Sequence, residues 1–171
     1  SNWNEMKKNG LGLLLWGSVG SGKSYMAACV ANELIKQGAD VKMTNFATVL
    51  NDLFNCEDKN EYIRSLCRYS LLILDDLGIE CNTEYSLENL FNVIDARYVS
   101  GKAMIITTNL NLEELKNQKQ LSLKRIYDRV LERCIPVCVS ENDFRKDNRV
   151  EAKVKFGKII NGGKMDEEKY E

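Results

Sequence analysis

The glycine-rich segment Gly17–Ser24 constrains the fold of this chain more than any other part of its sequence. Its letters, Gly-Ser-Val-Gly-Ser-Gly-Lys-Ser, match the pattern G-x-x-x-x-G-K-[ST]. The apolar run Leu11–Trp16 before it predicts a buried strand, and Ser24–Gln37 after it predicts an amphipathic helix. Backbone N–H groups of such a loop, at a helix N-terminus, bind phosphate oxygens. A chance glycine-rich turn explains the letters less well, because the strand–loop–helix setting is also present.

Each residue type in this loop has a chemical reason. Glycine allows backbone angles and a close approach that a side chain would block. We expect Lys23 to reach the β- and γ-phosphates of a nucleoside triphosphate, and the Ser24 hydroxyl to ligate Mg²⁺. The expected nucleotide-binding residues are the loop, the residue that follows it and one distant arginine: Gly17, Ser18, Val19, Gly20, Ser21, Gly22, Lys23, Ser24, Tyr25 and Arg145.

Two further apolar runs end in polar residues. Leu71–Leu74 is followed by Asp75, expected in the Mg²⁺ shell, and by Asp76, expected to polarise the attacking water, a role more often given to glutamate. A pair of loop acids that caps the next element is the plainer alternative. The second run ends at Thr108 and Asn109. If its strand neighbours the other two, Asn109 reaches the γ-phosphate or the water; Thr108 is the second choice, and a simple turn the alternative.

Arg125, Arg129 and Arg133 recur at every fourth position of an amphipathic segment and therefore share one helix face. Pairing with Asp128 and Glu132 would make this face an ordinary solvated surface. An arginine presented to a neighbouring subunit would instead stabilise the transferring phosphoryl group. Arg129 is the first candidate for such an arginine finger and Arg125 the second, with Arg133 expected to be structural.

Strand and helix signals alternate along the chain, which predicts a single α/β domain whose parallel sheet is covered by helices on both faces. The expected strands are Leu11–Trp16, Val41–Thr44, Ser70–Leu74, Ala103–Thr107 and Ile135–Val139. The expected helices are Ser24–Gln37, Ala47–Phe54 after an Asn45 cap, Glu61–Tyr69, Ser86–Val99 with Ser86 as cap, a short one after an Asn111 cap, and Ser122–Cys134. Residues 1–149 form the expected domain, and 150–171 a polar, loosely ordered tail.

Composition excludes several classes of function. The formal net charge of −1 gives no global attraction to nucleic acid, so DNA contact would need a local strip of basic residues, which more often form a solvated surface. The candidates are Lys42, Lys59, Arg64, Arg68, Arg97 and Lys102. With no histidine and no C-x-x-C, a structural zinc site is not expected. The six cysteines fit buried, reduced thiols in a cytoplasmic protein, and no apolar run is long enough to span a membrane.

Four segments occur in the order, and at about the spacing, seen in DnaC/DnaI-type helicase loaders: the glycine-rich loop, L-L-I-L-D-D-L-G, I-I-T-T-N-L and R-I-Y-D-R-V-L-E-R-C. From Trp3 to about Arg149 the chain resembles this family, and it is also similar to the related IstB-type transposition helper ATPases; both belong to the AAA+ superfamily. The resemblance implies a three-layer α/β/α fold with a five-stranded parallel sheet and ATP as the nucleotide. It also implies single-stranded DNA binding, self-association through the nucleotide interface and delivery of a hexameric replicative helicase.

The resemblance assigns Lys23 and Ser24 to the first nucleotide motif, and Asp75 and Asp76 to the second. It makes Asn109 the first sensor, Arg129 or Arg125 the finger, and Arg145 the second sensor. Arg145 stands in Asp-Phe-Arg where the family has Ser-Tyr-Arg, and the loop reads Gly-Ser-Gly-Lys-Ser in place of Gly-Thr-Gly-Lys-Thr. The N-terminal helicase-binding domain of full loaders has no counterpart, so we expect an ATPase fragment or a short phage or mobile-element relative.

Three functions stay open at this point. A helicase loader and a transposition helper would share the fold and the site but differ in partner. A nucleotide-gated binding module with negligible turnover is the third, favoured slightly by Asp76 in place of glutamate. A small-molecule kinase is disfavoured, because the T-T-N sensor and the arginine helix would have no role in it. We expect a weak ATPase that oligomerisation completes.

Overall fold

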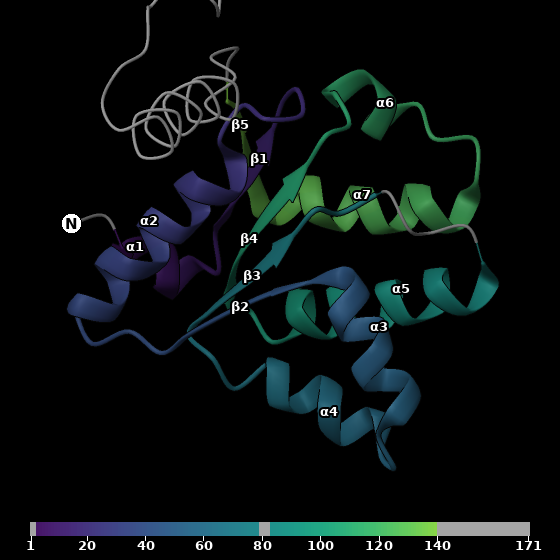
Figure 1. Ribbon diagram of the computed structural model, residues 1–171, viewed down its shortest axis with the longest axis horizontal. Helices are drawn as coiled ribbons and strands as arrows, with labels where there is room; N and C mark the ends of the chain where they lie inside the picture. Colours follow the sequence, from purple (N-terminus) through teal and green to yellow (C-terminus); the bar gives the residue numbers. More distant parts are fainter. Residues whose placement is uncertain (1–2, 79–82, 140–171) are drawn as a thin grey trace, which may run out of the picture.

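The computed structural model describes residues 3–78 and 83–139, and the fold is built on one sheet. Its strands are β1 (Gly12–Trp16), β2 (Val41–Asn45), β3 (Leu71–Asp75), β4 (Ala103–Thr108) and β5 (Cys134–Cys138). All neighbouring strands are parallel, and their order across the sheet is β2-β3-β4-β1-β5 (Figure 1). The predicted five-stranded parallel sheet is therefore confirmed.

The strand order puts β4 between β1 and β3. Trp16 of β1 pairs with Thr108 of β4, while Leu74 of β3 pairs with Ile106 of β4. Parallel strands end at the same edge of a sheet, and ligands of α/β proteins bind outside that carboxyl edge. The ends of β1, β3 and β4 therefore bring the three predicted nucleotide motifs to one place.

Helices cover both faces of the sheet (Figure 1). One face carries α1 (Trp3–Asn9) and α2 (Lys23–Lys36). The opposite face carries α3 (Phe46–Asn55), α4 (Lys59–Leu66), α5 (Glu84–Val99), α6 (Leu112–Lys116) and α7 (Leu121–Arg133). This is the predicted three-layer α/β/α arrangement.

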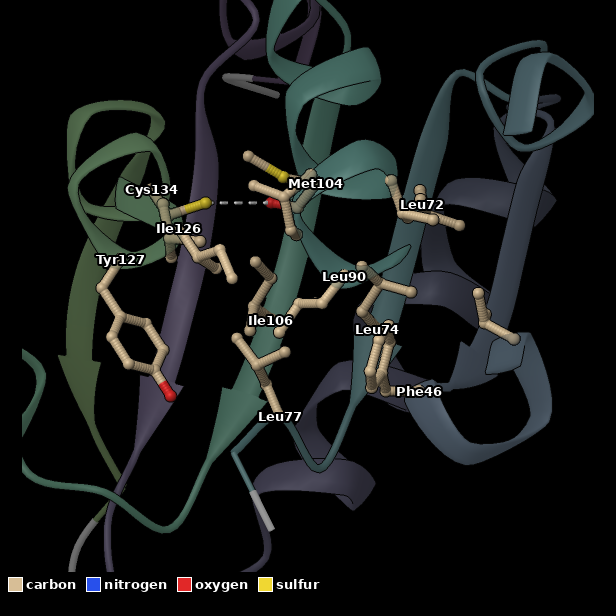
Figure 2. Close-up of a cluster of buried hydrophobic side chains, with 14 of the residues drawn as sticks. Phe46, Leu72, Leu74, Leu77, Leu90, Met104, Ile106, Ile126, Tyr127 and Cys134 are labelled. Carbon is tan, nitrogen blue, oxygen red and sulfur yellow. Dashed lines mark hydrogen bonds between the residues drawn. The ribbon is translucent and has the colours of Figure 1, made fainter. Parts of the chain in front are cut away.

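Two apolar clusters fill the space between the sheet and its helices. The larger joins α3, α5 and α7 to one face, and Figure 2 shows part of it around Leu74, Leu90, Ile106 and Ile126. The smaller packs α2 against the other face. Every residue of β4 is buried, and so are the first four residues of β3. Burial on both faces explains why the two runs are continuously apolar instead of alternating.

Three helices differ clearly from the prediction, and one of them is α4, which runs over Lys59–Leu66 where Glu61–Tyr69 was predicted. Helix α1 was not predicted, because it is short and has no fully buried residue, so its apolar periodicity is weak. Helix α5 begins at Glu84 with Thr83 as its cap, and the prediction of a Ser86 cap is wrong. Ser86 is the third residue of a capping box: the Ser86 N–H donates to Thr83 Oγ1 at 3.1 Å, and the Thr83 N–H donates to Ser86 Oγ at 3.2 Å.

Two other caps are confirmed. The Thr48 N–H donates to Asn45 Oδ1 at 2.8 Å at the start of α3, and the Glu114 N–H donates to Asn111 Oδ1 at 2.9 Å at the start of α6. Strand β5 begins one residue earlier than predicted, at Cys134. Its pairing with β1 runs from Gly12 beside Cys134 to Trp16 beside Cys138, so the register fixes that boundary.

Arg97 is fully buried, which rules out the DNA contact considered for it. Its guanidinium donates to the carbonyls of Tyr69 at 2.8 Å and Ser70 at 3.1 Å, and also to that of Ala103. Burial lowers the pKa of Arg97 to about 10. The side chain therefore joins α5 to the starts of β3 and β4 as a structural tie.

The thiols are less buried than expected. The five cysteines within the described residues are free, but only Cys134 is buried, while Cys29 and Cys138 are exposed. Burial raises the pKa of the Cys134 thiol to about 12. None of the helices in the two described ranges is long and apolar enough to cross a membrane. Arg145 and the tail at 150–171 lie outside the described residues.

Candidate functional site

The glycine-rich loop joins the end of β1 to the start of α2. Gly20 and Gly22 have φ angles of 88° and 95°, a left-handed conformation that side chains disfavour. Gly17 has a different reason: a Cβ there would lie 2.5 Å from the backbone oxygen of Val139. The loop conformation thus favours glycine at the two places that the motif fixes, Gly17 and Gly22, and also at Gly20, where the motif allows any residue.

Lys23 folds back over the loop. Its Nζ donates to the carbonyl oxygen of Gly17 at 2.9 Å and to that of Ser18 at 2.7 Å, and the residue is only 6% exposed. Gly22 caps α2 without a side chain, and the first turn of the helix has no acid. A buried ammonium beside a helix N-terminus that has no side-chain cap suits the phosphates of a nucleotide.

The flanking residues of the loop point outward to different degrees. Ser24 lies partly exposed in the first turn of α2, next to Lys23. Tyr25 and Val19 are 76% and 66% exposed. Ligation of Mg²⁺ by Ser24 and contact of Tyr25 with the nucleotide stay predictions.

The acids after β3 are tied to β4 by hydrogen bonds. Asp75 Oδ1 accepts from Thr107 Oγ1 at 2.6 Å, and the Asp76 N–H donates to the same hydroxyl oxygen at 2.8 Å. Asn109 Nδ2 donates to Asp76 Oδ1 at 3.0 Å. Asp76 has a φ of 62° and is the one residue other than glycine with positive φ among the described residues. Three hydrogen bonds thus tie the two acids at the end of β3 to Thr107 and Asn109 at the end of β4.

Strand order meets the condition set for Asn109, because β4 does lie next to both β1 and β3. Thr108, the second choice, is fully buried, and its hydroxyl donates to the backbone oxygen of Leu77 at 2.7 Å. Its hydroxyl therefore fastens a loop and does not face a ligand. Thr107, which sequence reasoning did not single out, contacts both acids. Thr107 lies near the end of β4, between the two strands that lead to the loop and to the acids, and this position could have pointed to it.

The arginine helix α7 packs against α5 on one face of the sheet. Arg129 Nε lies 2.7 Å from Asp95 Oδ1, and the two side chains are 30% and 34% exposed. The guanidinium carbon lies 4.6 Å from the ring centre of Phe91 and 5.7 Å from that of Tyr98. Tyr98 in turn donates to Glu132 Oε1 at 2.6 Å, which raises the pKa of Tyr98. Arg129 is thus held by contacts within its own chain.

Arg125 is placed differently from Arg129. It is exposed and lines a cavity of about 370 Å³ between the first turns of α5 and α7, together with Glu84, Glu88 and Phe91. Among the described residues, no ion pair or hydrogen bond joins Arg125 or Arg129 to the glycine-rich loop or to the two acids. The structure therefore gathers the loop, the acids and Asn109, and leaves both arginines outside that group.

Comparison with known proteins identifies the family. The family of IstB-like ATP binding proteins matches residues 2–152. The uncharacterized protein YdaV of Escherichia coli K12 is 34% identical over 118 residues, which are 67% of this chain and 46% of that protein. The replicative helicase loader DnaC of Escherichia coli K12 is 28% identical over 119 residues, 67% of this chain and 47% of that protein.

The chain spans about half the length of these curated relatives. Among solved structures, the crystal structure of DnaI is similar with a TM-score of 0.67 and 22% identity, covering 82% of this chain and 79% of that one. This likeness shows the fold, an AAA+ phosphate-loop domain. The chain therefore belongs to the IstB-like ATP-binding protein family and has the fold of an AAA+ ATPase.

Proposed function

We propose that this chain is the ATPase domain of a DNA replication protein of the helicase-loader type, which acts on single-stranded DNA and a hexameric replicative helicase. The observation that carries the ATPase part is the contact between strand ends: Asn109 Nδ2 lies 3.0 Å from Asp76 Oδ1, beside the strand that leads into the glycine-rich loop. A sensor amide in contact with a water-polarising carboxylate couples the state of the nucleotide to the chemistry.

ATP and Mg²⁺ supply the γ-phosphoryl group and neutralise its charge when they are bound. In this proposal Lys23 binds the β- and γ-phosphates, and Ser24 and Asp75 hold the Mg²⁺ shell. Asp76 orients the attacking water by accepting its proton or hydrogen bond. Asn109 keeps the Asp76 carboxylate turned toward β4, which is supported by the hydrogen bond between them.

Hydrolysis is completed between subunits in this proposal. A finger arginine acts on the nucleotide of the neighbour, and self-association occurs through the nucleotide interface. Arg129 is the first candidate and Arg125 the second. The contacts of Arg129 with Asp95 and Phe91 support a weak ATPase in the isolated chain, because the guanidinium must leave them before it reaches another subunit.

The nucleic-acid part rests on exposed basic residues. Arg64 and Arg68 lie at α4 and just beyond it, each paired with Glu61, and their side chains are 69% and 71% exposed. Exposed pairs of this kind are worth about 0–1 kcal/mol, so DNA phosphates can replace Glu61 at little cost. Binding through phosphates falls steeply as salt rises.

Transposition is the second candidate, because the matching family is named for IstB-like proteins. Fluorescence anisotropy with labelled single-stranded and duplex oligonucleotides of one sequence, with ATP and Mg²⁺, separates the two. A loader prefers the single strand, and a transposition helper prefers the duplex. Lys23→Ala and Arg64→Gln with Arg68→Gln are the informative variants: the first should remove the nucleotide dependence, and the double variant should flatten the salt dependence.

Equal, salt-insensitive affinity for both DNAs would contradict the nucleic-acid part and leave the ATPase part standing. Adding a hexameric replicative helicase then tests the partner, since a loader should raise the amount of helicase that is retained on the single strand. We also infer a cytoplasmic, reducing location, which the free thiols support.

A further inference from the structure

Thr107 is the last residue but one of β4, and its side chain faces the acids of β3. The residue is 1% exposed. Its hydroxyl donates to Asp75 Oδ1 at 2.6 Å and accepts from the Asp76 N–H at 2.8 Å. A hydroxyl has one proton to donate and two lone pairs. Thr107 donates that proton to the Asp75 carboxylate and uses a lone pair to accept from the Asp76 N–H.

The bond to Asp75 fixes which carboxylate oxygen stays available. Oδ1 is occupied by the Thr107 hydroxyl, and Oδ2 has no hydrogen bond or ion pair among the described residues. A carboxylate held at one oxygen keeps its other oxygen in a fixed direction. Partners that orient a metal ligand in this way typically change metal affinity by about 10–100-fold when removed.

The bond to Asp76 holds an unusual backbone. The φ of 62° is in the left-handed region, which aspartate tolerates better than most residues but which still costs energy. A second bond from β4 helps to maintain it: the Leu77 N–H donates to the backbone oxygen of Thr107 at 2.8 Å. One residue of β4 therefore clamps the chain on both sides of the Asp76 carbon.

We propose that Thr107 is a positioning residue for the ATPase site, which sets the direction of the Mg²⁺ ligand and the conformation of the water-polarising acid through a single hydroxyl. The proposal rests on the roles proposed above for Asp75 and Asp76. Thr107 itself is buried and bonds both acids, so in this proposal it acts through them.

Thr108 provides a matched control. It is the next residue in the same strand, is equally buried, and also uses its hydroxyl, which donates to the Leu77 oxygen at 2.7 Å and accepts from the Leu110 N–H at 3.2 Å. Its hydroxyl contacts neither acid. Thr108→Val and Thr107→Val therefore remove the same group from equivalent depth, and only the second removes a tie to the site.

The experiment measures Mn²⁺ binding by electron paramagnetic resonance with a non-hydrolysable ATP analogue, the Mg²⁺ dependence of hydrolysis, and thermal unfolding. Thr107→Val should weaken Mn²⁺ binding about tenfold and raise the half-maximal Mg²⁺ concentration by a similar factor. Nucleotide affinity without metal should not change. Thr107→Ser should restore both values to within about threefold, since it keeps the hydroxyl. Thr108→Val should leave both at the wild-type values even where it lowers the melting temperature.

Metal binding by Thr107→Val equal to that of Thr108→Val would overturn the proposal. If the valine variant does not fold, Thr107→Ala removes the same hydroxyl without adding bulk, and the same criteria apply. Asp75→Asn separates this failure from a failure of the site assignment. If Asp75→Asn binds Mn²⁺ normally, the proposed role of Asp75 is wrong; if it loses Mn²⁺ while Thr107→Val keeps it, only the positioning role is wrong.

Discussion

The strand-end site and the face between α5 and α7 differ in how they use their polar groups. At the strand ends, Thr107 and Asn109 hold Asp75 and Asp76 within the proposed catalytic arrangement. Between α5 and α7, the Arg129 guanidinium contacts Asp95 and two aromatic rings. The strand-end site is organised within a single chain, whereas Arg129 has to leave its present contacts before it can act on the nucleotide of a neighbouring subunit. Nucleotide binding should therefore be intrinsic, and hydrolysis should depend on assembly.

Removal of the loop lysine breaks the first region most completely. Lys23→Ala should reduce ATP binding below detection and lower hydrolysis by more than about 1000-fold, because phosphate binding and charge stabilisation are both lost. Isothermal titration with ATP and Mg²⁺ measures the binding. Lys36→Ala is the matched control, an exposed lysine at the other end of α2 that should bind normally. Unchanged affinity of Lys23→Ala would refute the nucleotide site.

Removal of the proposed finger arginine should affect hydrolysis and leave the strand-end site intact. Arg129→Ala should lower hydrolysis on the order of 1000-fold, because fingers supply charge only to the transition state, and should leave ATP affinity unchanged. Mixing two variants tests whether the arginine acts on a neighbouring subunit. Arg129→Ala subunits keep a working loop, and Lys23→Ala subunits keep a working arginine, so the mixture should recover activity that neither has alone.

No recovery in the mixture would count against an arginine that acts in trans. The same two measurements on Arg125→Ala decide between the candidates. Only one of the two variants should combine lost hydrolysis with recovery by Lys23→Ala subunits. Thermal unfolding of each variant checks that the packing of α7 against α5 survives, since Arg129 also contacts Phe91 and Tyr98.

A change at the second acid tests the strand-end region without affecting binding. Asp76→Asn should lower the hydrolysis rate about 100-fold at saturating ATP, because the amide is a poor proton acceptor for the attacking water. The Kd for ATP should stay within about twofold, since Asp76 makes no proposed contact with the phosphates. Asp40→Asn, an exposed acid before β2, serves as the control. Wild-type turnover by Asp76→Asn would remove this residue from the mechanism.

The smallest predicted effect comes from loosening the arginine. Asp95→Asn removes the ion pair of Arg129, and pairs this exposed are worth at most about 1 kcal/mol. The hydrolysis rate at low protein concentration should therefore rise by about threefold, a change within that energy. Steady-state assays across a concentration series measure it. A fall in rate at every concentration would mean that Asp95 positions Arg129 for its role instead of withholding it.

The sequence predicted most of the fold and the centre of the site for an identifiable reason. Continuous apolar runs identified the buried strands, and the polar residues that follow two of them, Asp75, Asp76 and Asn109, became candidates for the site of the glycine-rich loop. The strand order could not be predicted from the residues alone, because no local pattern states which strands pair. The structure supplies it, and β4 pairs with both β1 and β3.

Contacts between side chains far apart in the chain could not be predicted from the sequence. The two bonds of Thr107 depend on which strands are neighbours, and the pair of Arg129 with Asp95 depends on how α7 packs on α5. Arg97 was considered as a DNA contact, since arginine is seldom fully buried, yet its two terminal nitrogens donate to backbone carbonyls inside the domain. These are tertiary effects, which override the preference of the single residue.

Specific ATP hydrolysis rate against protein concentration, with and without single-stranded DNA, tests most directly the claim that assembly completes this site. The rate per subunit should rise with concentration and rise further with DNA, while ATP affinity stays constant. A rate per subunit that is already maximal at the lowest concentration, and indifferent to DNA, would show that one chain carries the whole active site and would contradict the account.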